Sequence, residues 1–323
     1  MEIPPDYKIT SEILFWISQI EAKRIYFSAS DIPRHVREKI QRVSLLKSSL
    51  FSTRIEGNPL ELSDLEEGKK EDEKKLEVFN IVDSVKILDR ISSKKITKNL
   101  ILRLHAKVLH RISPDAGSFR NEASAIFNQA GVAVYVPPAP WDIPALVDRL
   151  LRYINSNKEI FPLINAFVSH LIFEKIHPFL DGNGRVGRLF IAAVLKSKGW
   201  DFAFTVPFEK YLDEHKDEYY FHLDRGMKHT EEYLLFMLKA FHEELDLIKE
   251  QVEALASKRD EPFLPPRQEE IYNIIKDHLV VSFDMVRRRF LRVPERTLRY
   301  DLKNLLIADL LKNMVKKGED IIV

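Results

Sequence analysis

Apolar side chains recur at intervals of three and four residues along several stretches of the chain. The clearest series lie within residues 36–50, 101–112 and 233–245. This spacing places apolar side chains on one face of an α-helix, so each series predicts an amphipathic helix that packs against a core. Only ten glycines are spread over the 323 residues, so the helices are rarely interrupted. The pattern predicts a mainly α-helical fold.

Two other stretches break the helical pattern. Residues 125–140, AIFNQAGVAVYVPPAP, join β-prone side chains to a Gln-Ala-Gly turn signal and end in prolines. That composition predicts a short β-hairpin followed by an extended segment. Residues 258–266, KRDEPFLPP, carry charges and three prolines, which predicts a linker.

Beyond the linker, the pattern predicts a small separate domain, residues 267–323. Helices are expected over about 267–277 and 283–290, and a third opens at Pro294. The tail, KNMVKKGEDIIV, predicts two short strands about a Lys-Gly turn. Three helices followed by a hairpin predict a winged helix-turn-helix domain.

The composition excludes several classes of protein. Fifty Lys and Arg residues against 49 Asp and Glu residues leave a net charge of +1, so any basic surface must be local. The absence of cysteine excludes disulfide scaffolds, cysteine-ligated metal sites and thiol nucleophiles. The first residues, MEIPPDYK, do not form a signal peptide, and no apolar run approaches about 20 residues. We therefore expect a cytoplasmic protein without a membrane segment.

The most informative segment is IHPFLDGNGRVGRLF, residues 176–190. Its Asp-Gly and Asn-Gly dipeptides are turn signals, and GNG alone would mark only a loop between two helices. This loop also holds a histidine, an acid and two arginines between two apolar stretches. A connection between buried helices has no structural need for so many polar groups, so the cluster favours a binding or catalytic site.

The backbone of this segment favours a phosphate ligand. Gly182 and Gly184 allow close approach of a ligand, and a helix that begins near Arg185 directs its free amides and positive dipole end to the same place. Arg185 and Arg188 are three residues apart and share a helix face, so two guanidinium groups can grip further phosphates. The residues therefore predict binding of a polyphosphate.

Two further side chains indicate the chemistry. Asp181 offers a hard carboxylate oxygen, and Mg²⁺ commonly binds through one or two carboxylates together with phosphate oxygens. His177 has an ordinary pKa of about 6.5, so it is mostly neutral at neutral pH and can accept a proton. No Ser-His-Asp arrangement or carboxylate pair competes for this role, so we expect the nucleophile to be a hydroxyl on another molecule.

Residues 177–188, HPFLDGNGRVGR, resemble the signature of the Fic family, H-x-F-x-[DE]-G-N-G-R-x-x-R, at every specified position. The resemblance extends over about residues 95–245. It implies a Fic-type helical domain over residues 95–257, preceded by an N-terminal helical region over residues 1–94. It also implies transfer of AMP from ATP to a protein hydroxyl, with release of pyrophosphate.

The resemblance further implies a role for each residue of the motif. His177 is the expected catalytic base, Asp181 the expected Mg²⁺ ligand, and Phe179 an apolar anchor for the loop. Arg188 is expected to hold the γ-phosphate, and Asn183 with neighbouring glycine amides the α- and β-phosphates. The expected nucleotide-binding set is Gly182, Asn183, Gly184, Arg185, Val186, Gly187 and Arg188.

Residues 52–57, STRIEG, match the family's inhibitory pattern, [ST]-x-x-x-E-[GN], through Ser52, Glu56 and Gly57. A simpler interpretation is that Gly57 ends a helix and that Glu56 is a solvated acid. With the catalytic motif present, we expect inhibition, in which Glu56 pairs with Arg188 and occupies the group that the γ-phosphate needs. Some relatives also use this glutamate to hydrolyse the AMP bond, so the reverse reaction stays open.

The predicted hairpin, residues 125–138, resembles the family's flap, whose edge strand aligns the hydroxyl-bearing segment of a target protein. An ordinary surface hairpin is the alternative. One position departs from the family, because this chain has His215 where relatives often carry an asparagine near the adenine. The implied partners are ATP and a target protein; self-modification and a homodimer also stay open.

The C-terminal domain is locally basic. Residues 265–317 hold twelve Lys and Arg residues against seven Asp and Glu residues. DNA binding through residues 267–323 and protein contact through the same surface are equally open. The arginines that cluster around the second and third predicted helices are Arg287, Arg288, Arg289, Arg292, Arg296 and Arg299.

The residues and the resemblance together predict an autoinhibited protein adenylyltransferase that uses ATP with Mg²⁺. One alternative is a DNA-binding transcriptional regulator whose helical core senses a nucleotide. Another is a de-AMPylase, or a transferase that moves a different nucleotide or phosphate group at the same site.

Overall fold

The structure, a computed structural model, divides into two compact units, residues 1–254 and 255–323. Each unit is described by itself below. The residues that the structure describes are 1–65, 72–88, 95–127, 133–156, 158–200, 202, 204–257, 264–278, 281–291, 293–307, 311, 313–316 and 319–322.

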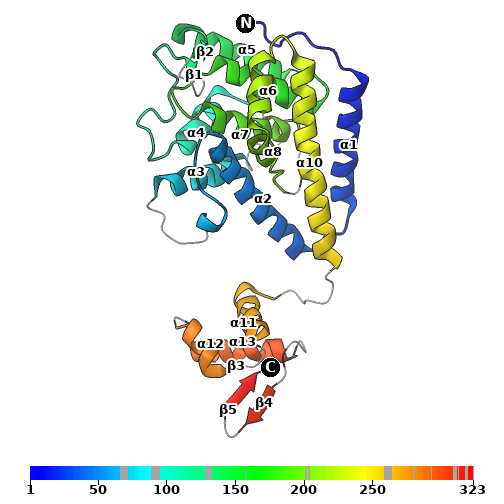
Figure 1. Ribbon diagram of the computed structural model, residues 1–323, viewed down its shortest axis with the longest axis vertical. Helices are drawn as coiled ribbons and strands as arrows, with labels where there is room; N and C mark the ends of the chain where they lie inside the picture. Colours follow the sequence, from blue (N-terminus) through cyan, green and yellow to red (C-terminus); the bar gives the residue numbers. More distant parts are fainter. Residues whose placement is uncertain are drawn as a thin grey trace. The chain divides into compact units, whose positions relative to one another are not determined.

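The larger unit is built almost entirely from helices (Figure 1), which confirms the predicted mainly α-helical fold. Two 3₁₀ turns, η1 (Ser63–Leu65) and η2 (Pro140–Asp142), accompany them. The helices are α1 (Ser11–Ala29), α2 (Arg34–Ile55), α3 (Glu73–Leu88), α4 (Lys98–Val108), α5 (Ile143–Asn155), α6 (Pro162–Ile176), α7 (Asn183–Ser197), α8 (Glu209–Glu214), α9 (Lys216–Arg225) and α10 (Thr230–Ser257).

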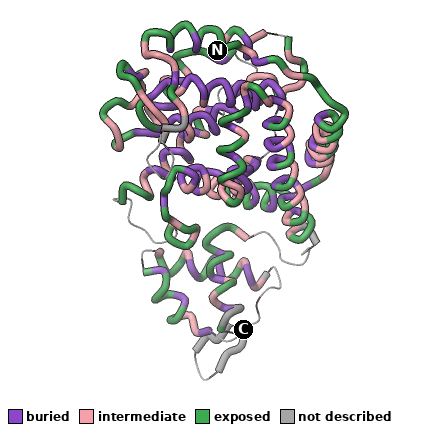
Figure 2. The backbone as a smooth tube through the Cα atoms, turned by 45° about the horizontal axis from the view of Figure 1, so that its top comes forward, coloured by how far each residue is buried: buried purple, intermediate pink, exposed green. Residues whose placement is uncertain are grey.

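Helix α6 lies at the centre of this unit because it has almost no polar face. Every residue from Leu163 to Phe173 is buried, and Figure 2 shows buried residues concentrated in the helices of the interior. A helix that is buried on all sides has to be surrounded by other elements. Helix α7 packs along α6. Gly187 permits the close approach, because a Cβ there would collide with the Glu174 carboxylate. The loop that joins the two helices is therefore held at both ends by a buried helix pair.

The N-terminal helices belong to the same unit. Helix α1 runs beside α10 (Figure 1), and Lys23 Nζ lies 3.2 Å from Asp246 Oδ1 across that contact. Helix α2 packs against α3, α7 and α8. No boundary between compact units falls near residue 94, since the described residues on both sides of 89–94 share one unit. The N-terminal region thus contributes directly to the surroundings of α7.

Two short strands lie within the predicted hairpin. Strands β1 (Ile126–Phe127) and β2 (Ala133–Tyr135) pair antiparallel, with Ile126 opposite Tyr135. Residues 128–132 between them lie outside the described residues. The Tyr135 hydroxyl donates to the Lys175 carbonyl at 2.7 Å, so β2 is tied to the end of α6. The role of this pair as a flap stays a prediction.

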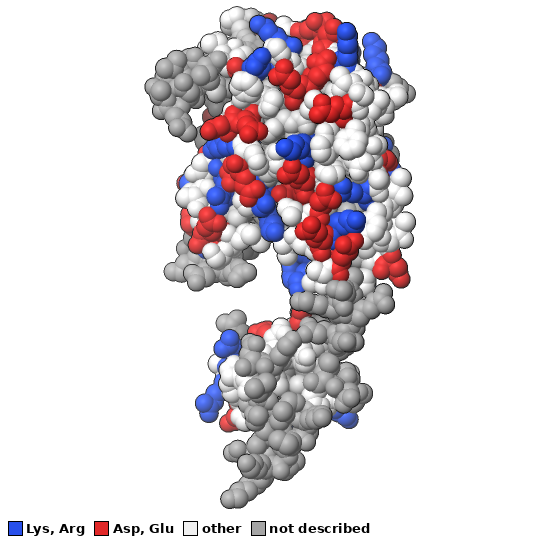
Figure 3. Space-filling view, turned by 45° about the vertical axis from the view of Figure 1, so that its right-hand side comes forward, with Lys and Arg blue, Asp and Glu red and all other residues white. Residues whose placement is uncertain are grey.

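The surface of the larger unit carries charges of both signs. On the face seen in Figure 3, acidic and basic side chains are interspersed, in keeping with a net charge of +1 for the whole chain. Among the helices that the structure describes, none combines the length and the apolar character that crossing a bilayer would require.

The smaller unit combines three helices with a small antiparallel sheet of order β3-β5-β4. Strand β3 was not predicted from the sequence. The predicted linker falls largely on residues 258–263, which lie outside the described residues, as does Arg292. The elements are α11 (Pro266–His278), β3 (Val281–Ser282), α12 (Phe283–Arg289), α13 (Glu295–Ile307), β4 (Asn313–Lys316) and β5 (Glu319–Ile322).

Apolar side chains of all three helices form a core of the smaller unit. Ile271, Val286 and Leu298 are each fully buried there. Asp301 is also buried, and its carboxylate accepts hydrogen bonds from Arg267 and Gln268, which join α13 to α11. The name winged helix for this unit stays a prediction.

Candidate functional site

The loop of residues 177–182 connects α6 to α7 through two left-handed residues. Gly182, before α7, has φ 78°, and His177, after α6, has φ 48°. Glycine adopts this conformation freely, but a histidine there is strained by about 1–3 kcal/mol. The surrounding contacts hold His177 in place, since its N–H donates to the Phe173 carbonyl at 2.9 Å. Strain at a position with proton-transfer chemistry points to a functional site.

His177 is a neutral base in this setting. Burial, followed by the nearby Arg120 charge, lowers the pKa of His177 to about 4. The same arginine fixes the backbone, because Arg120 Nε donates to the His177 carbonyl at 2.8 Å and the Arg120 N–H donates to the Pro178 carbonyl at 2.9 Å. At neutral pH the imidazole is therefore uncharged and able to take up a proton.

Asn183 and Phe179 brace the loop from within. Asn183 Oδ1 accepts from the Phe179 N–H at 2.9 Å, and Asn183 Nδ2 donates to the Phe179 carbonyl at 2.8 Å. The Phe179 side chain is fully buried, as an anchor requires. Each polar atom of the Asn183 side chain thus makes one hydrogen bond that shapes the loop. The contact of Asn183 with phosphate stays a prediction.

His105 supports the same loop from α4. Its ring stacks on Phe179, with centroids 3.6 Å apart and planes 6° from parallel. The Gly117 N–H donates to His105 Nδ1 at 2.8 Å, so the proton of the neutral ring lies on Nε2, which donates to the Asp181 carbonyl at 3.0 Å. Burial lowers the pKa of His105, which preserves this neutral tautomer. His105 therefore acts as a fixed spacer under the loop.

Asp181 is the exposed acid of the loop. Both its oxygens lie 2.9 Å from Arg185 Nη2, and Oδ1 accepts from the Gly182 N–H at 2.6 Å. Arg185 itself is buried and also lies 3.8 Å from Glu77 on α3. Among the described residues, no cluster of three or more His, Asp or Glu side chains could hold a metal alone. Asp181 could therefore bind Mg²⁺ only together with phosphate oxygens of a ligand. Mg²⁺ commonly binds to proteins in this way when a nucleotide is present.

Arg188 is held by the end of α2. It is 1% exposed, its Nε donates to Ser52 Oγ at 3.0 Å, and its Nη2 donates to the Ser52 carbonyl at 2.7 Å and to Glu56 Oε1 at 2.8 Å. Burial is the largest influence and lowers the pKa of Arg188, but Glu56, Tyr219 and Tyr220 together outweigh it, so the pKa of Arg188 is raised. Gly57, with φ 94°, ends the helix directly after Glu56. A Cβ on Gly184 would collide with Glu56 Oε1, so this carboxylate already lies at the anion-binding start of α7.

Comparison with known proteins finds similarity over the part of the chain that contains this loop. Residues 95–195 match the model of the Fic/DOC family. The chain is 29% identical over 198 residues to the protein adenylyltransferase Fic of Drosophila willistoni, and 28% identical to that of Drosophila melanogaster. The alignment covers 57% of this chain and 38% of the Drosophila willistoni protein, so the chain spans about two fifths of the length of that relative.

Solved structures show the same fold at low sequence identity. A Fic family protein from Desulfovibrio desulfuricans G20 superposes with a TM-score of 0.72 at 19% identity, over 98% of this chain and 97% of that chain. Fic-1 from C. elegans superposes with a TM-score of 0.60 at 19% identity, over 76% of this chain and 73% of the other. The larger unit is therefore a Fic-like helical fold with distant homology to Fic adenylyltransferases.

Two residues of the expected nucleotide-binding set, Val186 and Gly187, do not face the loop. The Val186 side chain is fully buried, and its N–H donates to the Gly182 carbonyl at 3.0 Å, which leaves no free amide. Gly187 faces α6 and serves the packing of the two helices. The helix start that remains open to an anion consists of Asn183, Gly184 and Arg185, whose amides precede the first intrahelical bond.

The sequence did not indicate a role for several residues that surround the loop of residues 177–182. His105 and Arg120 lie far from the motif along the chain. Glu174, on α6, is nearly buried beside Arg188, and burial raises its pKa to about 8. Its only sequence signal is its place three residues before His177. His215, the departure from the family pattern, stacks on Tyr211 at 3.9 Å.

Replacing His105 with Phe tests its support of the loop. The new ring can keep the stack on Phe179, but the Gly117 N–H and the Asp181 carbonyl lose their partner. We expect the free energy of unfolding in urea to fall by about 1–3 kcal/mol, the cost of leaving buried backbone groups unpaired. Exchange of the Gly117 amide hydrogen should accelerate.

The matched control is His110→Phe, because His110 follows α4 with an exposed side chain. That variant should change neither quantity. Unchanged stability and unchanged Gly117 exchange in His105→Phe would show that the loop does not depend on His105.

Proposed function

We propose that this chain is a protein adenylyltransferase that its own Glu56 holds inactive. The observation that carries the proposal is the Glu56 carboxylate, which pairs with Arg188 at 2.8 Å and lies against Gly184 at the start of α7. The distant homology of residues 95–195 to Fic adenylyltransferases supports the same conclusion. The substrate is ATP, and the acceptor is a hydroxyl of a target protein or of the chain itself.

The proposed reaction needs few groups. The amides at the start of α7 and the Arg188 guanidinium bind the phosphates, while His177 takes the proton from the acceptor hydroxyl. The hydroxyl oxygen then forms a bond to the α-phosphorus, and the bond to pyrophosphate breaks. Asp181 would hold Mg²⁺, which supplies positive charge beside the phosphates when bound. Fixed donors around the developing charge supply most of the rate gain, and His177 adds about 10²–10⁴-fold.

The proposed inhibition is a competition for one cation. The Glu56 carboxylate and a γ-phosphate both require Arg188 and the same side of Gly184. Ser52 does not compete, because its hydroxyl and carbonyl bind Arg188 through other hydrogen bonds. Loss of Glu56 would therefore free the anion site and leave the guanidinium oriented.

Strands β1 and β2 are the proposed guide for the acceptor. Each strand of a two-stranded pair has one unpaired edge that an extended peptide can extend. Tyr135 and Arg120 connect this pair to the end of α6, since Arg120 Nη2 donates to the Pro138 carbonyl at 2.5 Å and Arg120 Nε to the His177 carbonyl. A peptide on the edge of β2 would thus be tied to the position of the base.

The smaller unit carries a second candidate function, DNA binding, on its exposed arginines. Arg287 and Arg299 both contact Glu295, at 3.4 and 3.0 Å, which partly neutralises them. Arg288 and Arg289 are exposed at the end of α12 and form no ion pair with the described residues. Such arginines suit contacts with a phosphate backbone.

Removal of Glu56 should switch the enzyme on. In Glu56→Gly we expect label to pass from [α-³²P]ATP to protein at least tenfold faster than in the original chain, because the γ-phosphate gains Arg188. Label from [γ-³²P]ATP should not be transferred. Autoradiography of the separated proteins measures both.

Two further variants control this experiment. Glu61→Gly removes an exposed acid that contacts Arg54 at 2.8 Å, and it should remain inactive. Glu56→Gly with His177→Ala should lose transfer but still bind ATP. Transfer of the γ-label would indicate phosphorylation instead, and no transfer of either label would favour a nucleotide sensor.

The pH dependence of the Glu56→Gly variant should reflect the lowered pKa of His177. A base must be neutral, so its activity is lost only as the pH falls through its pKa, which is about 4 here. Glu56 itself raises that pKa, so its removal does not move the loss toward neutral pH. We expect initial rates of AMP transfer at pH 5.5 and 7.5 to agree within about twofold, whereas a free imidazole with a pKa of about 6.5 would give about a tenfold decrease. A tenfold decrease would contradict the proposed environment of His177.

DNA binding by the full chain should depend on Arg288 and Arg289. For the double variant Arg288→Ala/Arg289→Ala, the slope of log affinity against log salt should decrease by about 2, since each lost phosphate contact removes about 0.9. Fluorescence anisotropy with a labelled duplex measures it. The control Arg34→Ala/Arg37→Ala changes exposed arginines of α2 and should retain the original slope. No binding of the duplex by the full chain would favour the alternative of protein contact.

A further inference from the structure

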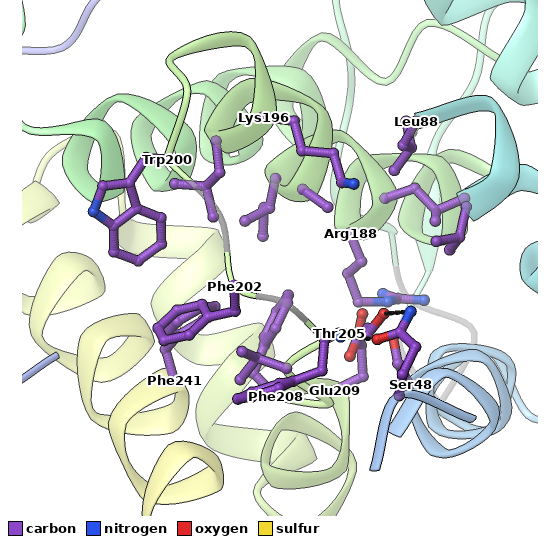
Figure 4. A pocket seen from close by; sticks show the side chains of 18 residues that line it. Ser48, Leu88, Arg188, Lys196, Trp200, Phe202, Thr205, Phe208, Glu209 and Phe241 are labelled. Atoms are coloured by element: carbon purple, nitrogen blue, oxygen red, sulfur yellow. Dashed lines mark hydrogen bonds between the residues drawn. The ribbon is translucent and has the colours of Figure 1, made fainter. Parts of the chain in front are cut away.

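A cavity of about 170 Å³ lies beside α7, between α2, α3 and a wall that includes Trp200, Phe202 and residues 204–206 and 208. Figure 4 shows aromatic side chains gathered on one side of it. A volume near 150 Å³ with apolar walls is enough to bind benzene in an engineered cavity of another protein. This cavity therefore has room for one aromatic ring with a short substituent. The rings that line it belong to Trp200, Phe202, Phe204, Phe208 and Phe241.

The wall of this cavity includes a buried carboxylate with an unused oxygen. Glu209, the first residue of α8, is only 5% exposed, and its Oε2 has no hydrogen-bond partner among the described residues. Burial raises the pKa of Glu209 to about 7, although a hydrogen bond with the Ser48 side chain acts in the opposite direction. A buried acceptor without a donor is unfavourable. A ligand that donates a hydrogen bond to Glu209 Oε2 would therefore satisfy this acceptor.

The other polar groups of the wall are already engaged. The Thr205 N–H donates to Gln41 Oε1 at 2.7 Å, and Gln41 Nε2 donates to Thr205 Oγ1 at 3.5 Å. Arg188 is bonded to Ser52 and Glu56. Lys196 lies on a different side of the cavity from Glu209 in Figure 4. Glu209 Oε2 is thus the atom of the described wall that still lacks a hydrogen-bond donor.

We propose that this cavity is a ligand site for a small aromatic molecule with an amine or amidine group, whose ring lies among the aromatic side chains and whose donor binds Glu209. Arg188 lines this cavity and also pairs with Glu56, but binding of the aromatic molecule requires neither ATP nor His177. The ring supplies apolar contact, and the cationic donor pairs with Glu209, whose carboxylate is the one that the described residues contribute to the cavity wall.

Benzylamine is the probe for this proposal, used with the full chain. Isothermal titration should show saturable binding with one site, and the melting temperature should rise with benzylamine concentration. Benzoate has the same ring but a carboxylate, so it should not bind. Glu209→Gln should weaken benzylamine binding at least about tenfold, which is a change of about 1.4 kcal/mol.

Two variants keep the test decisive. Glu214→Gln alters an exposed glutamate on the same helix and should leave binding unchanged. Ala192→Leu fills part of the cavity without a change of charge, because Ala192 lines it, and it should abolish binding even if Glu209→Gln folds poorly. The proposal is overturned if benzylamine does not bind, if benzoate binds equally well, or if benzylamine binds Ala192→Leu with unchanged affinity.

Discussion

One buried cation, Arg188, determines how the end of α2 packs against the start of α7. Arg188 is 1% exposed, and a guanidinium so far from water has to be surrounded by acceptors. The end of α2 supplies them through the Ser52 hydroxyl, the Ser52 carbonyl and the Glu56 carboxylate. The match to the Fic/DOC family covers only residues 95–195, yet the charge at its centre is satisfied by residues outside it. The N-terminal helices are therefore part of the site and not an appendage to it.

The three hydrogen bonds from Arg188 to the end of α2 differ in exposure, which suits replacement of one partner by another anion. Ser52 is 2% exposed and holds two of the bonds, whereas the Glu56 side chain keeps 33% of its surface exposed. Removing one partner of a fully buried ion pair typically costs about 3–5 kcal/mol, but solvent that reaches Glu56 reduces that cost here. The Ser52 bonds remain when Glu56 leaves, so Arg188 stays oriented for another anion. A carboxylate at the solvent side of a buried cation is replaceable by a phosphate, whereas a fully enclosed partner would not be.

The sequence predicted the parts of the site that are local and missed those that depend on distant contacts. The apolar stretches on both sides of the motif and its turn residues located α6, the loop and the start of α7, because both signals act within a few residues. The braces of the loop come from elsewhere in the chain, since His105 is 76 residues from Asp181 and Arg120 is 57 residues from His177. No single-sequence pattern pairs residues so far apart.

The motif did not reveal how its own side chains hold the loop. The Asn183 side chain hydrogen-bonds to both polar atoms of the Phe179 backbone, and the motif letters alone do not indicate this pairing. The pairing of Glu56 with Arg188, 132 residues away, was expected only because of the family resemblance. The Glu56 carboxylate can lie against residue 184 because glycine has no Cβ. The sequence shows that residue 184 is a glycine, but it does not show which side chain lies against it.

Helix α2 links the anion site to the aromatic cavity. Ser48 and Ser52 are four residues apart and share one face of this helix; Ser48 hydrogen-bonds to Glu209, and Ser52 to Arg188. Arg188 in turn lines the cavity while it holds Glu56. Because a helix moves as a rigid unit over one turn, a shift of α2 that lengthens the bond from Arg188 to Ser52 must also change the wall at Ser48. The contact of Arg188 with α2 and the shape of the cavity are therefore set by the same turn of one helix.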